Sequence, residues 1–160
     1  MKYNADGDLL FTASKDHRPT VWYSDTGDRL GTFSPHGGAV WDLDPNWDST
    51  YLVTACADFR ARLFEITTGE YVAQMIHKGV VRSVKWGDGS QRFVTAADPF
   101  TSRDLGTISV YNFPSPEDLT EGMLYAPVRS ILPFIDVVCC FHQLQRMLRT
   151  IMVPSTRRHT

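Results

Sequence analysis

The sequence has no long apolar run and few cysteines. No segment approaches the roughly 18 apolar residues of a membrane-spanning helix, and no apolar stretch of the secretory signal type follows Met1. Its three cysteines are Cys56, Cys139 and Cys140, an odd and sparse set without metal-ligand spacing. These absences favour a cytoplasmic protein in a reducing compartment.

The sequence also has no excess of positive charge. Its formal net charge is −2, so the whole chain exerts no electrostatic attraction on nucleic acid or on an anionic membrane. Any contact with RNA would have to be local. We therefore predict neither a membrane partner nor direct sequence-specific binding of nucleic acid.

An internal repeat is the main feature that is present. Residues 9–14, 20–23 and 29–33 are β-prone runs separated by turn residues. A shift of 42 residues reproduces this pattern and superposes Ala13 on Ala55, Asp16 on Asp58, Trp22 on Phe64 and Gly27 on Gly69. A third, looser copy aligns Asp98, and it aligns Tyr111 if 99–106 is an insertion. A period of about 40–45 residues with four strands is typical of the blade of a WD-type β-propeller.

The repeat predicts an all-β fold, a partial WD40-type β-propeller with about three four-stranded blades. The predicted blades are 1–33, 34–76 and 77–130, and the segment 114–127, with its prolines and acids, is predicted to be an exposed linker. Propellers usually close with about four to eight blades, so these blades are expected to form part of something larger.

The segment 131–160 differs from the blades and is predicted to be a separate tail. Its apolar residues follow a helical period, which predicts a short amphipathic helix at 137–152: Val137, Cys140, Phe141, Leu144, Met147, Leu148 and Ile151. This helix could dock on the propeller, could be foreign to the fold, or could bind a membrane or a partner.

The sequence offers no convincing catalytic group. Asp42 and Asp44 would share one face of a strand beside a turn, where solvated or capping roles are commoner than acid–base catalysis. Cys140 and His142 would point in roughly opposite directions on a helix. Residues 87–89 are too short for a phosphate-binding loop. We therefore predict a protein that is not an enzyme and has no cofactor and no metal.

The segment 8–33, DLLFTASKDHRPTVWYSDTGDRLGTF, resembles the subunit i family of eukaryotic translation initiation factor 3, whose members are seven-bladed WD-repeat proteins. The resemblance continues through 36–41, 57–58, 62–64 and 68–69, weakens after Trp86 and ends near Ile131. The family's first strand, its Gly-His pair and its later blades have no counterpart, which suggests a fragment or a divergent form. The resemblance implies a non-catalytic scaffold that binds subunits b and g and acts indirectly on the small ribosomal subunit.

The resemblance also implies a buried hydrogen-bond relay, which in such propellers joins a His, an Asp, a Ser or Thr, and a Trp. Here it maps onto His36, Asp58 and Thr54, with Phe64 in place of the indole. The first blade has Asp16 and Trp22, with Thr12 or Ser14, but no His. These residues are expected to be structural.

One rim of the propeller is the candidate partner surface. Loop residues that mix cations with an aromatic side chain are expected there: Lys15, His17, Arg18, Phe59, Arg60 and Arg82. They could equally be ordinary solvated loop residues. Two functions besides the scaffold remain open: a generic WD-repeat adaptor, such as a ubiquitin-ligase receptor or signalling platform, and a truncated product without stable function.

Overall fold

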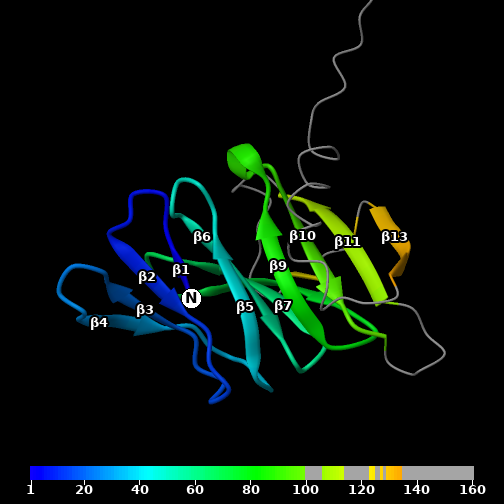
Figure 1. Cartoon of the computed structure of the whole chain (residues 1–160), viewed down its shortest axis with the longest axis horizontal. Helices are drawn as coiled ribbons and strands as arrows, with labels where there is room; N and C mark the ends of the chain where they lie inside the picture. The colour runs from blue at the N-terminus through cyan, green and yellow to red at the C-terminus, as the bar shows by residue number, and fades with distance from the viewer. Residues whose placement is uncertain (100–105, 114–122, 125–126, 128, 135–160) are drawn as a thin grey trace, which may run out of the picture.

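The structure is a computed structural model, and it describes residues 1–99, 106–113, 123–124, 127 and 129–134. The described residues form three β-sheets that lie side by side, with β4 at one end and β13 at the other (Figure 1). No helix among the described residues is long and apolar enough to cross a membrane. The predicted helix at 137–152 lies outside the described residues.

Sheets one and two follow the repeat closely. Sheet one consists of β1 (Lys2–Tyr3), β2 (Leu9–Thr12), β3 (Thr20–Tyr23) and β4 (Arg29–Thr32), in that order. Sheet two contains β5 (Val40–Pro45), β6 (Tyr51–Cys56), β7 (Arg60–Glu65) and β8 (Tyr71–Ile76), also antiparallel and in chain order. Gly27 and Gly69 both adopt a φ of 74° in equivalent turns, where a side chain would be strained. The predicted all-β, blade-like architecture is confirmed.

Sheet three contains β9 (Val81–Trp86), β10 (Arg92–Ala97), β11 (Gly106–Asn112) and β13 (Arg129–Phe134), with a short 3-10 turn at Asp88–Ser90. The strand β13 continues past residue 130, where the last blade was expected to end. Because β13 is an edge strand, Pro133 can be accommodated there. The predicted division of the chain into domains stays a prediction, since 135–160 lies outside the described residues.

The segment predicted as a linker contains one further strand, which corrects that expectation. β12 (Met123–Leu124) lies parallel to the outer edge of β8, with Met123 opposite Ala73 and Leu124 opposite Gln74. Two residues are too few to give an alternating pattern, so the sequence contains no signal for this strand. The open edge of β8 provides its hydrogen-bonding partners.

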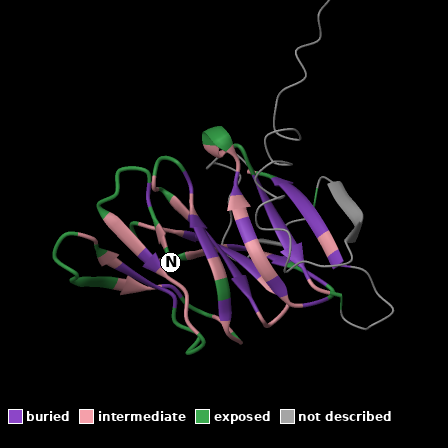
Figure 2. Ribbon diagram, in the orientation of Figure 1, coloured by how far each residue is buried: buried purple, intermediate pink, exposed green. Residues whose placement is uncertain are grey.

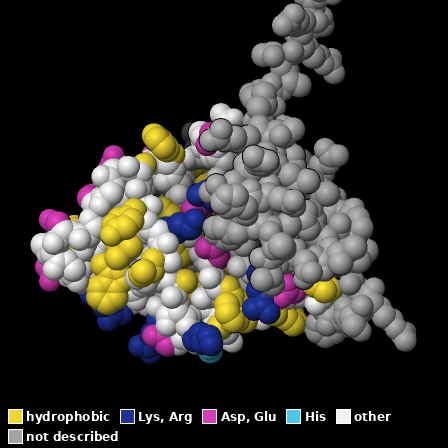
Figure 3. Space-filling view, viewed as in Figure 1, with side chains coloured by type: hydrophobic (Ala, Val, Ile, Leu, Met, Phe, Trp, Pro, Cys, Tyr) yellow, Lys and Arg dark blue, Asp and Glu magenta, His cyan; other side chains and the backbone are white. Residues whose placement is uncertain are grey.

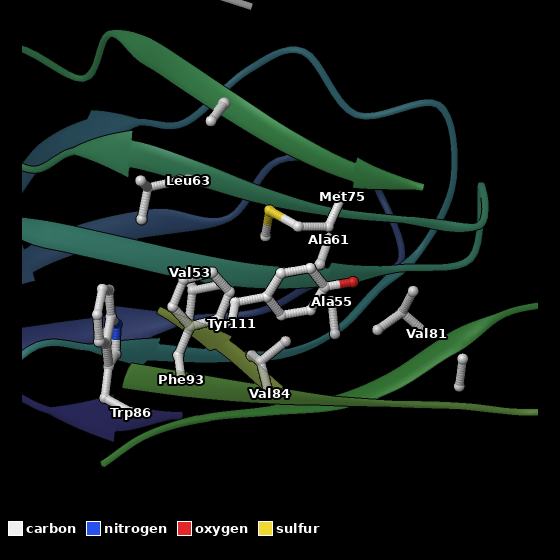
Figure 4. Close-up of a cluster of buried hydrophobic side chains, with 12 residues drawn as sticks. Val53, Ala55, Ala61, Leu63, Met75, Val81, Val84, Trp86, Phe93 and Tyr111 are labelled. Carbon is white, nitrogen blue, oxygen red and sulfur yellow. The ribbon is translucent and has the colours of Figure 1, made fainter. Parts of the chain in front are cut away.

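Two hydrophobic cores join the sheets, and the strands β6, β7, β10 and β11 are largely buried (Figure 2). The core between sheets two and three is formed by side chains that face one another across the sheets, including Val53, Leu63, Phe93 and Tyr111 (Figure 4). The rings of Phe93 and Tyr111 are stacked with centroids 5.1 Å apart. The core between sheets one and two is smaller and is centred on Phe11, Phe33 and Phe64.

Candidate functional site

The loop before sheet two places His36 against Thr54, as the resemblance implied. The His36 Nε2 and Thr54 Oγ1 atoms are 2.9 Å apart, and Nδ1 lies 3.2 Å from the Phe33 carbonyl oxygen. Because that carbonyl can only accept, Nδ1 carries the proton and Nε2 accepts from the hydroxyl. Burial, and then the charge of Arg62, lower the pKa of His36 to about 4. The ring is therefore neutral at pH 7.

Asp58 lies in the same corner but does not bond to the imidazole. Its carboxylate accepts hydrogen bonds from the Gly37 N–H at 2.8 Å and from the Arg62 guanidinium at 2.7 and 3.1 Å. Burial alone would raise the pKa of Asp58, but the hydrogen bonds from Arg62 and Gly37 outweigh it and lower the pKa to about 2. Asp58 thus holds the loop next to His36 in place. It pairs with Arg62 instead of making the direct contact with His36 that was expected.

Phe64 replaces the indole by packing instead of donating. It is fully buried, and its ring lies 5.3 Å from the His36 ring and 5.6 Å from that of Phe33. In this blade the series of hydrogen-bonded side chains therefore ends at Thr54. Next to it, the rings of His36, Phe64 and Phe33 form an aromatic cluster.

In sheet one the corresponding residues split into two groups. The Trp22 Nε1–H donates to Thr12 Oγ1 at 2.9 Å, which forms the hydroxyl–indole half of a relay. Asp16 lies in the exposed β2–β3 loop and accepts from the Arg18 N–H at 2.9 Å. That backbone hydrogen bond, followed by one from Ser14, lowers the pKa of Asp16. The structure does not bring Asp16 and Trp22 together.

Sheet three contains a third such cluster, which the sequence reasoning missed. His77 Nε2 lies 3.3 Å from Thr95 Oγ1 and 3.5 Å from the Tyr111 hydroxyl. The signal was available, because a shift of 41 residues carries His36 onto His77 and Thr54 onto Thr95. Burial lowers the pKa of His77 to about 4. Sheets two and three therefore share a His–Thr pair at equivalent positions.

Two carboxylates join the inner strands of sheets two and three, and the sequence reasoning missed this role as well. Asp42 Oδ2 accepts from Ser83 Oγ at 2.8 Å and from the Val84 N–H at 3.2 Å. Asp44 accepts from Lys85 Nζ and from the Trp86 N–H, both at 2.8 Å, and its other neighbour is Lys2 Nζ of β1 at 3.9 Å. As predicted, both carboxylates lie on one face of β5, but this face packs against sheet three instead of facing solvent.

The six candidate rim residues lie in the β2–β3 and β6–β7 connections and at the starts of β7 and β9. Lys15, His17 and Arg18 are exposed, and His17 and Phe59 share a left-handed backbone, with φ of 68° and 66°, at positions 42 residues apart. Arg82 is tied down, because its guanidinium lies 4.5 Å from the centre of the Trp41 ring and its Nε donates to Asp98 at 2.5 Å. Lys15, Arg18 and Arg60 form none of the ion pairs among the described residues.

The geometry therefore defines a protein class. The three antiparallel four-stranded units, joined face to face and each with a threonine hydroxyl bonded to a histidine or an indole, are those of a WD-repeat β-propeller. A family comparison agrees, since residues 27–65 match the WD domain, G-beta repeat.

Comparison with curated proteins gives the particular relatives. Proteins named eukaryotic translation initiation factor 3 subunit I are 43% identical over 98 residues in Drosophila willistoni and 44% identical over 98 residues in Nematostella vectensis, in each case over 61% of this chain and 30% of the relative. The protein of that name from Drosophila grimshawi is 37% identical over 130 residues, 80% of this chain and 40% of the relative. The chain is a WD-repeat homologue of initiation factor 3 subunit I that spans less than half the length of these relatives.

The buried histidines predict that acid destabilises the fold. His36 and His77 have a folded-state pKa of about 4 and an unfolded value of 6.5, so the unfolded chain binds more protons between these values. Their contribution to stability is complete above pH 6.5 and is lost as the pH falls toward 4. We expect the free energy of unfolding to decrease by about 2 kcal/mol for each histidine between pH 7 and pH 5.

Urea denaturation at both pH values would measure this effect. Asp44 acts in the opposite direction, because burial raises its pKa despite Lys85 and its protonation in acid favours the fold. A His77→Gln variant isolates the histidine, and its stability should depend less on pH than that of the parent. His17→Gln, at an exposed position, is the matched control for the substitution itself. Equal profiles for the parent and His77→Gln would contradict the assignment.

Proposed function

We propose that this chain is a non-catalytic scaffold of eukaryotic translation initiation factor 3. The observation that carries the proposal is the similarity to a subunit I protein over 80% of the chain. By this proposal the chain acts in the cytoplasm, binds other subunits of the factor, with b and g as the expected ones, and contacts the small ribosomal subunit through them. It thereby supports recruitment of mRNA and initiator tRNA.

The hydrogen bonds made by the polar side chains of these sheets support a structural role. His36, Asp58 and Asp44 are all engaged in holding loops or neighbouring sheets, and the described residues contain no group of three or more potential metal ligands. The relay residues predicted from the sequence are accordingly proposed to be structural.

The proposed contact surface is the rim around the β2–β3 and β6–β7 connections. Its exposed cations, Lys15 and Arg18, are free of ion pairs among the described residues, and Trp41 beside Arg82 is 43% exposed. Cations next to a partly exposed indole form a mixed surface of the kind that protein interfaces favour.

Affinity purification of the tagged chain followed by mass spectrometry tests the proposal. We expect other subunits of initiation factor 3, and we expect Lys15→Glu/Arg18→Glu to reduce their recovery at least about tenfold, since both charges would be reversed at the interface. Arg92→Glu, an exposed arginine in β10 outside this rim, is the matched control. Recovery of ligase components would favour the generic adaptor instead, and recovery of chaperones alone would indicate a product without stable function.

A further inference from the structure

The two ends of the sheets differ in charge, because the connections at one end combine Lys15, Arg18 and Lys78 with Asp16, Asp58 and Asp98, whereas those at the other end contain acids alone. The β1–β2, β3–β4, β5–β6, β7–β8 and β9–β10 connections contain only acids among their charged residues: Asp6, Asp8, Asp25, Asp28, Asp48, Glu70 and Asp88. We call this end the acidic rim. Figure 3 shows Asp and Glu along the upper and left edges of the molecule, whereas Lys and Arg occur together with Asp and Glu along the lower edge. The net charge of −2 thus combines an acidic end with an end of mixed charge.

A groove of about 510 Å³ opens on the acidic rim between the β3–β4 hairpin and the β7–β8 turn. Its walls combine apolar side chains, among them Leu9, Tyr23, Leu30 and Ile66, with polar groups that include Asp8 and Thr68. Tyr23 is 45% exposed and Leu30 is 46% exposed. Large apolar side chains in a concave surface of this kind are typical of binding sites.

The outer edge of β4 adds a second feature next to the groove. β4 ends sheet one, so its outer backbone groups have no strand partner among the described residues. The equivalent strand of sheet two, β8, is paired along this edge by β12. The 42-residue repeat places Gly31 and Thr32 where Ala73 and Gln74 meet β12. The molecule itself therefore shows that this edge of a blade accepts an extended segment.

We propose that the groove and the β4 edge together form a docking site for an extended segment of a partner protein, with an apolar or aromatic side chain flanked by Lys or Arg. The segment adds to β4 as β12 adds to β8, and its apolar side chain enters the groove between Tyr23, Leu30 and Ile66. Its cations face the acidic rim, which repels nucleic acid and acidic peptides. This site is independent of the opposite rim proposed above.

Two synthetic peptides that share a central Leu-Trp pair test the proposal on the full chain. One peptide has flanking Arg and Lys, and the other has flanking Asp and Glu. We expect the basic peptide to bind at least about tenfold more tightly in fluorescence anisotropy, and its affinity to fall as salt rises. Equal affinity of the two peptides, or no binding of the basic one, would overturn the proposal.

Matched substitutions locate the site. Leu30→Lys removes an apolar contact in the groove and adds a repelling charge, so it should weaken binding of the basic peptide at least about tenfold. Ile76→Lys is the control, because Ile76 is also exposed, at 56%, but does not line the groove. Both side chains are exposed, so both variants should fold. Equal losses in the two variants would show general electrostatic attraction and overturn the proposal.

Hydrogen exchange tests the backbone pairing separately. Bound basic peptide should slow amide exchange in β4, at Gly31 or Thr32, and should leave β8 unchanged. Protection confined to other strands would place the peptide elsewhere and overturn the proposed site. Because these measurements use no subunit of initiation factor 3, their outcome is distinct from that of the purification experiment.

Discussion

Asp58→Ala is expected to destabilise the fold by about 3–5 kcal/mol, because it leaves the Arg62 guanidinium buried without its carboxylate. The Asp58 and Arg62 side chains are only 10% and 7% exposed, and their charged atoms are 2.7 Å apart. The substitution also removes the acceptor of the Gly37 N–H and so loosens the loop that carries His36. Urea denaturation at pH 7 would measure the loss.

The internal repeat supplies a matched control for this prediction. Asp16→Ala changes the equivalent residue of sheet one, which is exposed, and should cost less than about 0.5 kcal/mol. In a double-mutant cycle, Arg62→Leu should recover a large part of the loss caused by Asp58→Ala, since no buried charge then remains alone. Strict additivity of the two substitutions would show that the ion pair does not couple them.

Asp44→Ala is expected to destabilise the fold by about 2–4 kcal/mol through the contact between sheets two and three. The carboxylate is 3% exposed, and its removal leaves the buried Trp86 N–H without an acceptor and Lys85 without its partner. Lys85 can turn toward solvent, which limits the loss.

Two further variants make this second prediction specific. Asp44→Asn keeps an acceptor for the Trp86 N–H and should cost less than Asp44→Ala. Asp48→Ala, at an exposed position in the adjoining β5–β6 turn, should change the free energy of unfolding by less than about 0.5 kcal/mol. An Asp44→Ala variant as stable as the parent would contradict the prediction. It would show that burial of the charge costs as much free energy as its hydrogen bonds contribute.

The sequence predicted the strands well because their period and turns are local properties. Thr20–Tyr23 has the predicted bounds, and the strands predicted at 9–14 and 29–33 begin at Leu9 and Arg29 as expected. β12 escaped prediction because a neighbouring edge, and not its own pattern, makes it a strand. Prediction thus failed where a distant segment determines the local conformation.

The site was predicted in part for the same reason. The contact of His36 with Thr54 follows from the repeat, whereas the pairing of Asp58 with Arg62 depends on how a buried guanidinium is accommodated. The roles of Asp42 and Asp44 could not be predicted from alternation alone, because alternation gives the face of a strand but not what covers that face.

The two hydrophobic cores differ in size, and this difference predicts the order in which the sheets unfold. Sheet one is attached through the smaller cluster around Phe11, Phe33 and Phe64, whereas sheets two and three share the larger one around Phe93 and Tyr111. In a chain of stacked units that contact only their neighbours, opening begins at the unit with the weaker interface. Sheet one should therefore detach first under mild denaturant, leaving sheets two and three as the last cooperative unit to melt.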